Sequence, residues 1–108
     1  VYGSTSGVYG DAGGARFDET RALAPASARA RRRVAAEALL RWYGRAFGAQ
    51  VSLLRIPGIY ANDRPGGAPR ERVARGTPVL RADDDVHTNH IHADDLARAC
   101  IAALHRGR

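Results

Sequence analysis

The sequence predicts an α/β fold built on parallel strands. Short apolar runs that are typical of strands alternate along the chain with longer stretches of helical periodicity. The run at residues 51–56 is apolar rather than alternating, as expected for a parallel strand that is covered on both faces. Strands separated by a helix pair in parallel, because the crossover returns the chain to the same end of the sheet.

The first half of the chain predicts one strand and one long helix. Val1–Thr5 is a strand-like start, and the glycine-rich stretch at residues 6–14 ends it in a loop. Ser27 is a suitable N-cap and Gly48 a suitable helix-ending residue, so we expect a helix between them. The apolar stripe of this helix is made of Val34, Leu39, Leu40, Trp42, Tyr43 and Phe47.

The second half predicts a stopped strand, a long loop and a final helix. Pro57 and Gly58 are expected to stop the strand at residues 51–56 in a turn. Residues 65–78 lie between two Pro/Gly clusters and predict a loop with one helical turn. A brief extended stretch then leads into a helix from about Ala93 to His105.

The composition argues against a nucleic-acid-binding protein. The formal net charge of the 108-residue chain is +6, and all 17 basic residues are arginine. Because arginine, alanine and glycine share GC-rich codons, the charge indicates coding bias rather than a basic binding surface. No helix-turn-helix or zinc pattern accompanies it, and aromatic residues are few. We expect no nucleic-acid partner.

Cysteine usage and hydropathy bear on the compartment. Cys100 is the single cysteine, so no disulfide forms within the chain, and a reducing, cytoplasmic location is predicted. No apolar run approaches the roughly 18 residues of a membrane span, so no membrane partner is expected. The sequence starts within a strand pattern and contains no methionine. We therefore expect a piece of a longer protein.

Four stretches carry a resemblance to a known family. They are STSGVYGD at residues 4–11, RVAAEALLR at 33–41, LRIPGIYA at 54–61 and NHIHADDLARA at 89–99. In this order they resemble the motifs of the NAD-dependent epimerase/dehydratase family, the extended or atypical short-chain dehydrogenase/reductases. One such motif alone is weak evidence, but four in the family's order across nearly the whole chain are fairly specific.

This resemblance implies a fold and a cofactor. Residues 1–108 would form the C-terminal half of an NAD(P)-binding Rossmann-type domain, with the second half of a doubly wound parallel sheet and a small substrate-side loop region at residues 61–90. The glycine-rich turn that holds the cofactor pyrophosphate belongs to the first half of such a domain. The loops at residues 11–16 and 64–69 are too short to replace it. We therefore expect NAD or NADP to bind the intact protein and only weakly this chain alone.

The resemblance also assigns the catalytic positions. The family uses a Ser or Thr hydroxyl to orient the substrate oxygen, and a Tyr, four residues before a Lys, to transfer the proton. Counting back from the Val-Tyr-Gly at residues 8–10 places Thr5 at the Ser/Thr position, with Ser4 and Ser6 as possible substitutes. The alternative is that these small residues only close the end of the strand. Counting back from Glu37 places Arg29 at the tyrosine position and Arg33 at the lysine position.

The two arginines change the expected chemistry. Arg33 can replace lysine as a donor to ribose hydroxyls or to a phosphate. Arg29 cannot replace tyrosine as an acid or base, because its guanidinium stays protonated. Three interpretations stay open: the protein binds NAD(P) without turnover, another group transfers the proton, or the arginines form a solvated helix face. The candidates for the other group are Tyr9, Tyr60 and His90.

The remaining contacts implied by the resemblance concern the cofactor and the substrate. Cofactor contacts are assigned to Ser4, Arg33, Pro57 and Gly58. A plain strand-ending turn is the alternative reading of Pro57 and Gly58. Substrate contacts are assigned to Ser6, Asn89 and His90.

The histidines near residue 90 suggest a zinc-binding site, which we do not favour. His87, His90, His92 and Asp94 carry side chains suitable for zinc. However, an extended stretch sends His90 and His92 to one face and His87 to the other. We predict no metal site.

Together these features predict part of an NAD(P)-dependent epimerase/dehydratase-like oxidoreductase. It would act on a small-molecule substrate by hydride transfer at a carbon. The alternative is a non-catalytic NAD(P)-binding or regulatory protein of the same fold, which the arginine at position 29 favours. The resemblance further implies a homodimer of the intact protein, formed through the arginine-bearing helix.

Overall fold

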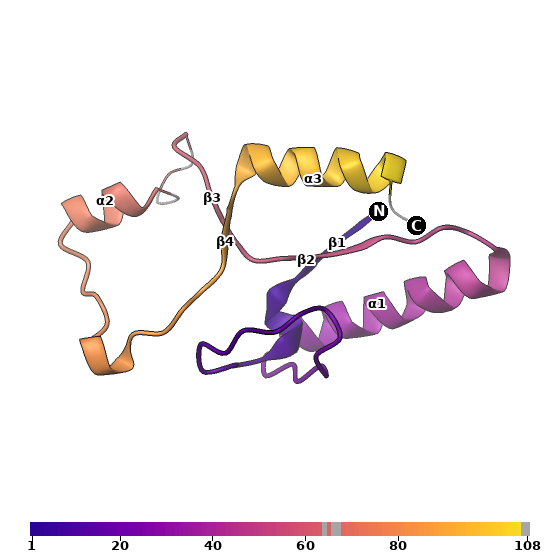
Figure 1. Cartoon of the computed structure of the whole chain (residues 1–108), viewed down its shortest axis with the longest axis horizontal. Helices are drawn as coiled ribbons and strands as arrows, with labels where there is room; N and C mark the ends of the chain where they lie inside the picture. The colour runs from indigo at the N-terminus through magenta and orange to yellow at the C-terminus, as the bar shows by residue number, and fades with distance from the viewer. Residues whose placement is uncertain (64, 66–67, 107–108) are drawn as a thin grey trace.

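The computed structural model describes residues 1–63, 65 and 68–106 (Figure 1). Residues 64, 66 and 67, which belong to the predicted loop at 64–69, lie outside the described residues. The elements in chain order are β1 (Tyr2–Thr5), the 3₁₀ turn η1 (Ser6–Tyr9), α1 (Ala28–Phe47), β2 (Leu53–Ile56), β3 (Gly58–Tyr60), α2 (Pro69–Ala74), the 3₁₀ turn η2 (Ala82–Asp84), β4 (His90–His92) and α3 (Ala93–Arg106).

The strands form two parallel pairs, which confirms the predicted α/β class. β1 pairs with β2, with Tyr2 opposite Leu53 and Thr5 opposite Ile56. β3 pairs with β4, with Ile59 opposite Ile91. In Figure 1, α1 lies below the β1–β2 pair and α3 lies above it. The arrangement is that of a partial Rossmann-type fold, in which helices cover both faces of a parallel sheet.

The ends of α1 confirm the sequence prediction, but its apolar stripe does not pack. The Ser27 hydroxyl accepts a hydrogen bond from the Ala30 N–H at 3.1 Å, and Gly48 ends the helix with φ 64°. The two residues that α1 buries are Ala30 and Glu37. Large apolar side chains of the predicted stripe are instead exposed, namely Leu39, Trp42, Tyr43 and Phe47.

The strand stops before Pro57 as predicted, since β2 ends at Ile56, but the predicted turn at Pro57 and Gly58 is not formed. The backbone passes through Pro57 directly into β3, which starts at Gly58, and Gly58 has no positive φ. The Gly58 N–H donates to the Asn89 carbonyl at 3.3 Å, so pairing with the segment before β4 keeps the chain extended. β2 lies between α1 and α3 but stays half-buried along its length, so the full cover that its apolar run predicted is incomplete.

The predictions for the rest of the second half are confirmed. The single helical turn expected within residues 65–78 is α2. The final helix, expected from about Ala93 to His105, is α3, which runs to Arg106. Among the described residues, no helix is both long and apolar enough to cross a membrane.

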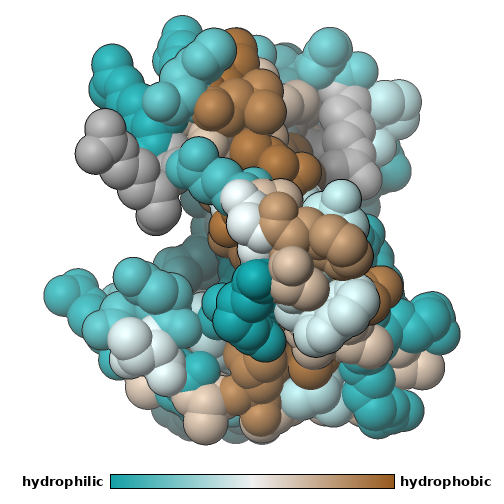
Figure 2. Space-filling view, turned by 90° about the vertical axis from the view of Figure 1, so that its right-hand side faces the viewer, coloured by the Kyte–Doolittle hydropathy of each residue, from teal (hydrophilic) through white to brown (hydrophobic). Residues whose placement is uncertain are grey.

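The apolar core of the described residues is small. Its buried members are Val8, Tyr9, Ala30, Ala61 and Ala68. The radius of gyration is 16.2 Å, against about 13 Å for a compact domain of this size. Figure 2 shows a band of apolar residues between hydrophilic flanks at the end of the molecule that lies to the right in Figure 1. With so few apolar side chains buried, the polar contacts between the elements carry much of the packing.

Candidate active site

The carboxyl ends of β1 and β2 bring two predicted segments together. Thr5 is the last residue of β1 and lies opposite Ile56, the last residue of β2. In a parallel pair both strands end at the same edge, and ligands of open α/β sheets bind there. Pro57 and Gly58 follow β2 and therefore lie beside the turn η1, which follows Thr5.

A cavity of about 380 Å³ opens at this edge. Its lining comes from η1, from the first turn of α1 and from the junction of β2 and β3. It includes Thr5, Ser6, Ser27, Arg29, Pro57 and Gly58. We call it the Thr5 cavity. Five residues that the sequence assigned to catalysis, substrate or cofactor thus surround one space.

Two of the predicted cofactor contacts lie outside the Thr5 cavity. Ser4 is buried, and its hydroxyl donates to Oε1 of Glu37 at 2.5 Å. Arg33 donates from Nη1 to the Tyr2 hydroxyl and to the Gly3 carbonyl, both at 2.9 Å. The side chains of both residues are therefore engaged with neighbouring elements. Their roles as cofactor contacts stay predictions.

Arg29 and Arg33 have different surroundings although they are four residues apart on α1. Arg29 lines the Thr5 cavity, and it makes no hydrogen bond or ion pair with any described residue. Arg33 lies along β1, with its guanidinium carbon 5.5 Å from the centre of the Tyr2 ring. Only Arg29 therefore has a guanidinium that is available to a ligand in this space.

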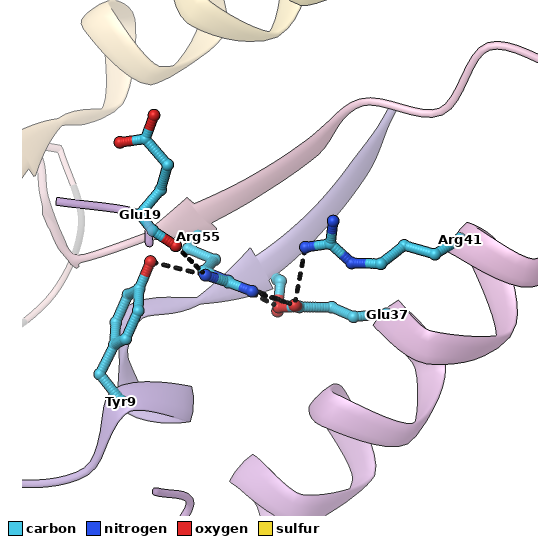
Figure 3. Close-up of polar contacts among 6 residues, drawn as sticks. Tyr9, Glu19, Glu37, Arg41 and Arg55 are labelled. Atoms are coloured by element: carbon cyan, nitrogen blue, oxygen red, sulfur yellow. Dashed lines mark hydrogen bonds and ion pairs between the residues drawn. The ribbon is translucent and has the colours of Figure 1, made fainter. Parts of the chain in front are cut away.

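Behind the Thr5 cavity lies a buried ion pair between Glu37 and Arg55. Glu37 is 1% exposed, and its Oε2 accepts from Nη2 and Nε of Arg55 at 2.8 and 3.2 Å. Arg41 adds a longer contact to Oε2, at 3.8 Å. Figure 3 shows the Arg55 guanidinium between the carboxylate of Glu37 and the ring of Tyr9. The pair joins α1 to β2.

Arg55 extends this pair to the turn that carries the site. Its Nη1 donates to the Tyr9 hydroxyl at 2.7 Å and to the backbone carbonyl of Glu19 at 3.1 Å. The Glu19 carboxylate points away from Arg55 (Figure 3). Because Tyr9 ends η1 and Ser4 precedes Thr5, the contacts from Glu37 and Arg55 fix both sides of Thr5. They therefore hold the wall of the Thr5 cavity.

Glu37 and Arg55 are both charged in this arrangement. Burial alone would raise the pKa of Glu37, but the hydrogen bonds from Arg55 and Ser4 outweigh it and lower that pKa below its ordinary value. The hydrogen bonds from Arg55 to Glu37 are the main cause that raises the pKa of Arg55. Sequence reasoning used Glu37 only to count positions and did not identify Arg55. A charged residue within the apolar run at 53–56 was the signal that could have found it.

None of the three candidate proton carriers lines the Thr5 cavity. Tyr9 is buried, with its hydroxyl bound by Arg55. Tyr60 packs edge-on against His92, with 5.2 Å between ring centres. The ring of His90 lies against Gly58, where a β-carbon would come within 2.7 Å of Cδ2. Of the three, His90 packs directly on a residue that lines the cavity.

Two larger cavities border the same turn. One, of about 640 Å³, is lined by residues that include Ser6, Tyr9, Arg55 and Asn89. The other, of about 630 Å³, lies between the loop after η1 and the segment before β4, and its lining includes Ser6, His87 and Asn89. Ser6 lines all three cavities, and Asn89 lines the two larger ones. These two predicted substrate residues thus lie where the cavities meet.

The histidine segment does not form a metal cluster in the part of the chain that the structure describes. No group of three or more His, Cys, Asp and Glu side chains converges there. Nδ1 of His92 lies 3.7 Å from Oδ2 of Asp94 and accepts the Asp94 N–H at 3.3 Å. This geometry provides no further ligand for an ion.

Comparison with known proteins gives one match. A family model described as the NAD dependent epimerase/dehydratase family matches residues 1–108, the whole chain. Searches of curated proteins and of solved structures returned no match.

Proposed function

The chain belongs to the NAD-dependent epimerase/dehydratase family, and we propose that the Thr5 cavity is the active site of an NAD(P)-dependent oxidoreductase. The observation that supports this proposal is the lining of the cavity. Thr5, Arg29 and the Pro57-Gly58 junction meet at the carboxyl edge of parallel strands. A nicotinamide cofactor belongs at that edge in folds of this type.

The residues present fit the nicotinamide end of such a cofactor. Pro57 and Gly58, which line the cavity, would lie against it. When bound, the nicotinamide gives or accepts a hydride at a substrate carbon. Arg33 is the proposed contact to the ribose. To make it, the guanidinium would have to exchange its bonds to Tyr2 and Gly3 for the ribose hydroxyls.

Thr5 is proposed to polarise the substrate oxygen. Its Oγ1 already accepts the Gly7 N–H at 3.2 Å, so the hydroxyl proton is directed to another acceptor. A carbonyl oxygen in the cavity is such an acceptor. Ser6 and Asn89 are the proposed substrate contacts, because Ser6 lines all three cavities and Asn89 lines the two larger ones.

The proton is proposed to come from a group other than Arg29. A guanidinium stays protonated near neutral pH and cannot act as a base. Of the candidates, His90 is favoured, because it packs on Gly58 at the edge of the cavity and an imidazole nitrogen can accept or donate a proton. The second candidate function is an NAD(P)-binding protein without turnover. The described residues that line the cavity include Arg29 but no carboxylate, tyrosine or histidine, which favours that function.

We expect Thr5→Val to reduce hydride transfer by the intact protein at least tenfold, or about 1.4 kcal/mol. The variant keeps the shape of the side chain and removes its donor. The measurement is the absorbance of NADH or NADPH at steady state with a panel of carbonyl compounds. Thr77→Val, at an exposed position away from the cavity, is the matched control and should leave the rate unchanged.

The outcomes of this assay separate the two functions. Cofactor binding and turnover that depends on Thr5 support the oxidoreductase. Cofactor binding without turnover over the whole panel favours the non-catalytic protein. An intact protein that binds neither NADH nor NADPH contradicts both functions.

We also propose that a second copy of the protein packs on α1. The exposed apolar side chains on this helix are Leu39, Trp42, Tyr43 and Phe47. The three aromatic rings among them form a cluster, with 4.7 Å between the ring centres of Tyr43 and Phe47 and 6.0 Å between those of Trp42 and Phe47. A cluster of this kind on a surface is typical of an interface.

We expect Trp42→Glu to convert a dimer of the intact protein into a monomer, because the change places a charge within the apolar contact. The measurement is molar mass by light scattering after size-exclusion chromatography. Val79→Glu, at a side chain that is 87% exposed and far from α1 in sequence, is the control and should leave the mass unchanged. A wild-type protein that is already monomeric contradicts the proposal.

A further inference from the structure

We propose that Arg29, with the hydroxyls of Thr5 and Ser27, forms a site for a small oxyanion, and that the ligand of this site is the carboxylate of the substrate. That the ligand is the substrate rests on the proposed function. The proposal names the class of that substrate as a small carboxylic acid. The site itself is argued from the charge, donors and size of the Thr5 cavity.

The first argument is the uncompensated charge of Arg29. It is the one ionisable side chain among the described residues that line the Thr5 cavity, and no carboxylate lines the cavity with it. Its guanidinium makes no bond to any described residue. Two arginines nearby are engaged, Arg33 with the backbone of β1 and Arg55 with Glu37. Arg29 is exposed and lies in the cavity lining, so it is open to a ligand that enters from solvent. An anion in the cavity would give Arg29 the partner that it lacks.

The second argument is the direction of the hydroxyl groups. Oγ1 of Thr5 accepts the Gly7 N–H at 3.2 Å, and Oγ of Ser27 accepts the Ala30 N–H at 3.1 Å. In each case the backbone occupies an acceptor site of the oxygen and leaves the hydroxyl proton to donate. The polar side chains that surround the cavity thus offer donors to a ligand that brings acceptors.

The third argument is the match between this donor set and a carboxylate. A carboxylate accepts hydrogen bonds at both oxygens, and the planar guanidinium of arginine donates to both at once. The volume of about 380 Å³ lies at the small end of the range of ligand pockets, roughly 300–1,000 Å³. A short acid therefore fits within the Thr5 cavity itself, whereas a larger substrate would have to extend past Ser6 into the neighbouring cavities. Arg29 would hold its carboxylate and Thr5 would donate to a neighbouring oxygen.

The test measures by calorimetry, at fixed ionic strength, how tightly the intact protein binds lactate, lactamide and inorganic phosphate. No nicotinamide cofactor is present. Lactate and lactamide have nearly the same shape and differ in the charge of one group. We expect lactate to bind at least tenfold more tightly than lactamide. Equal binding of the two, or binding of neither, overturns the proposal. Phosphate bound more tightly than lactate overturns the assignment to a carboxylate.

Variants assign the effect to Arg29. Arg29→Gln should weaken lactate binding at least tenfold, and Arg29→Lys should weaken it less, because the charge is kept and the two-pronged donor is lost. Arg32→Gln, which removes an exposed arginine of the same helix outside the cavity lining, should change binding by less than twofold. Lactate binding that is as tight in Arg29→Gln as in the wild type overturns the proposal.

Two readouts keep this result apart from the proposed function. The unfolding midpoint of each variant shows whether that variant is folded. We expect the Arg29 variants to keep the wild-type midpoint, because Arg29 makes no hydrogen bond or ion pair with any described residue. Cofactor binding is measured separately. A protein that binds lactate through Arg29 but no NADH or NADPH keeps the anion site and contradicts the oxidoreductase. A protein that binds cofactor but not lactate overturns the anion site, and its turnover then decides between the two proposed functions.

Discussion

Replacing Glu37 by alanine is expected to lower the free energy of unfolding by about 3–5 kcal/mol, the range found when one partner of a buried ion pair is removed. The side chain of Arg55 is only 13% exposed. Without Glu37 its charge would remain between α1 and β2 with the Tyr9 hydroxyl and the Glu19 carbonyl as partners. The Ser4 hydroxyl, also buried, would lose its acceptor.

The measurement for Glu37→Ala is urea unfolding followed by circular dichroism, with two controls. The double variant Glu37→Leu/Arg55→Leu removes both charges and should recover most of the lost stability, because a buried pair can be replaced by apolar residues at little cost. Arg98→Ala removes one partner of an exposed pair with Asp95 and should change stability by less than about 1 kcal/mol. A loss for Glu37→Ala no larger than that for Arg98→Ala would contradict the prediction.

The same pair gives the wild type a dependence on pH. Burial raises the pKa of Glu37, but the bonds from Arg55 and Ser4 lower it further, so the folded-state pKa lies below the unfolded value. The unfolded value is about 4.3. The stabilisation is therefore complete above that pH and is lost as the pH falls through the folded-state pKa. Glu37→Gln should remove this part of the acid dependence.

The consequence for function follows from the elements that the pair connects. Glu37 holds Ser4, which precedes Thr5, and Arg55 holds Tyr9, which ends the turn after Thr5. Loss of the pair should therefore disturb the hydroxyl that is proposed to polarise the substrate. We assign Glu37 and Arg55 a positioning role, because neither lines the Thr5 cavity.

Local signals predicted the elements of the fold well. Ser27 and Gly48 bound α1 because a capping hydroxyl and a left-handed backbone are properties of single residues. The turn at Pro57 and Gly58 failed for the opposite reason. Whether the chain turns or stays extended there depends on pairing with residue 90, which is distant in sequence.

The candidate site was predicted in its members but not in its contacts. Helical spacing places Arg29 and Arg33 on one side of α1, yet the first reaches the Thr5 cavity and the second reaches β1. The bonds of the buried pair join residues 18, 33 and 46 positions apart. A pattern read along the chain shows which side chains are charged. It does not show which of them meet, since that depends on how the elements pack.

Gly10→Ala is expected to lower the free energy of unfolding by about 3 kcal/mol or more. Gly10 has φ 70° and ψ −157°, a backbone region that is essentially restricted to glycine and costs other residues about 1–3 kcal/mol. A β-carbon there would also lie 2.3 Å from the backbone oxygen of Ala24. Ala24 cannot move away freely, because its N–H donates to the Val8 carbonyl at 3.0 Å. Relief of the contact would break that bond, which is worth about 1 kcal/mol.

Gly13→Ala separates the collision from the backbone strain. Gly13 also has a positive φ, 55°, but a β-carbon there meets nothing within 4 Å. Its replacement should cost about 1–2 kcal/mol, the penalty of a left-handed backbone alone. Urea unfolding of both variants gives the comparison. If Gly10→Ala and Gly13→Ala lower the free energy of unfolding equally, the loop at residues 10–24 moves away from the new β-carbon without loss of stability. A clearly larger loss for Gly10→Ala would show that the hydrogen bond from Ala24 to Val8 holds this loop against η1. The turn η1 carries Ser6 and forms one wall of the Thr5 cavity.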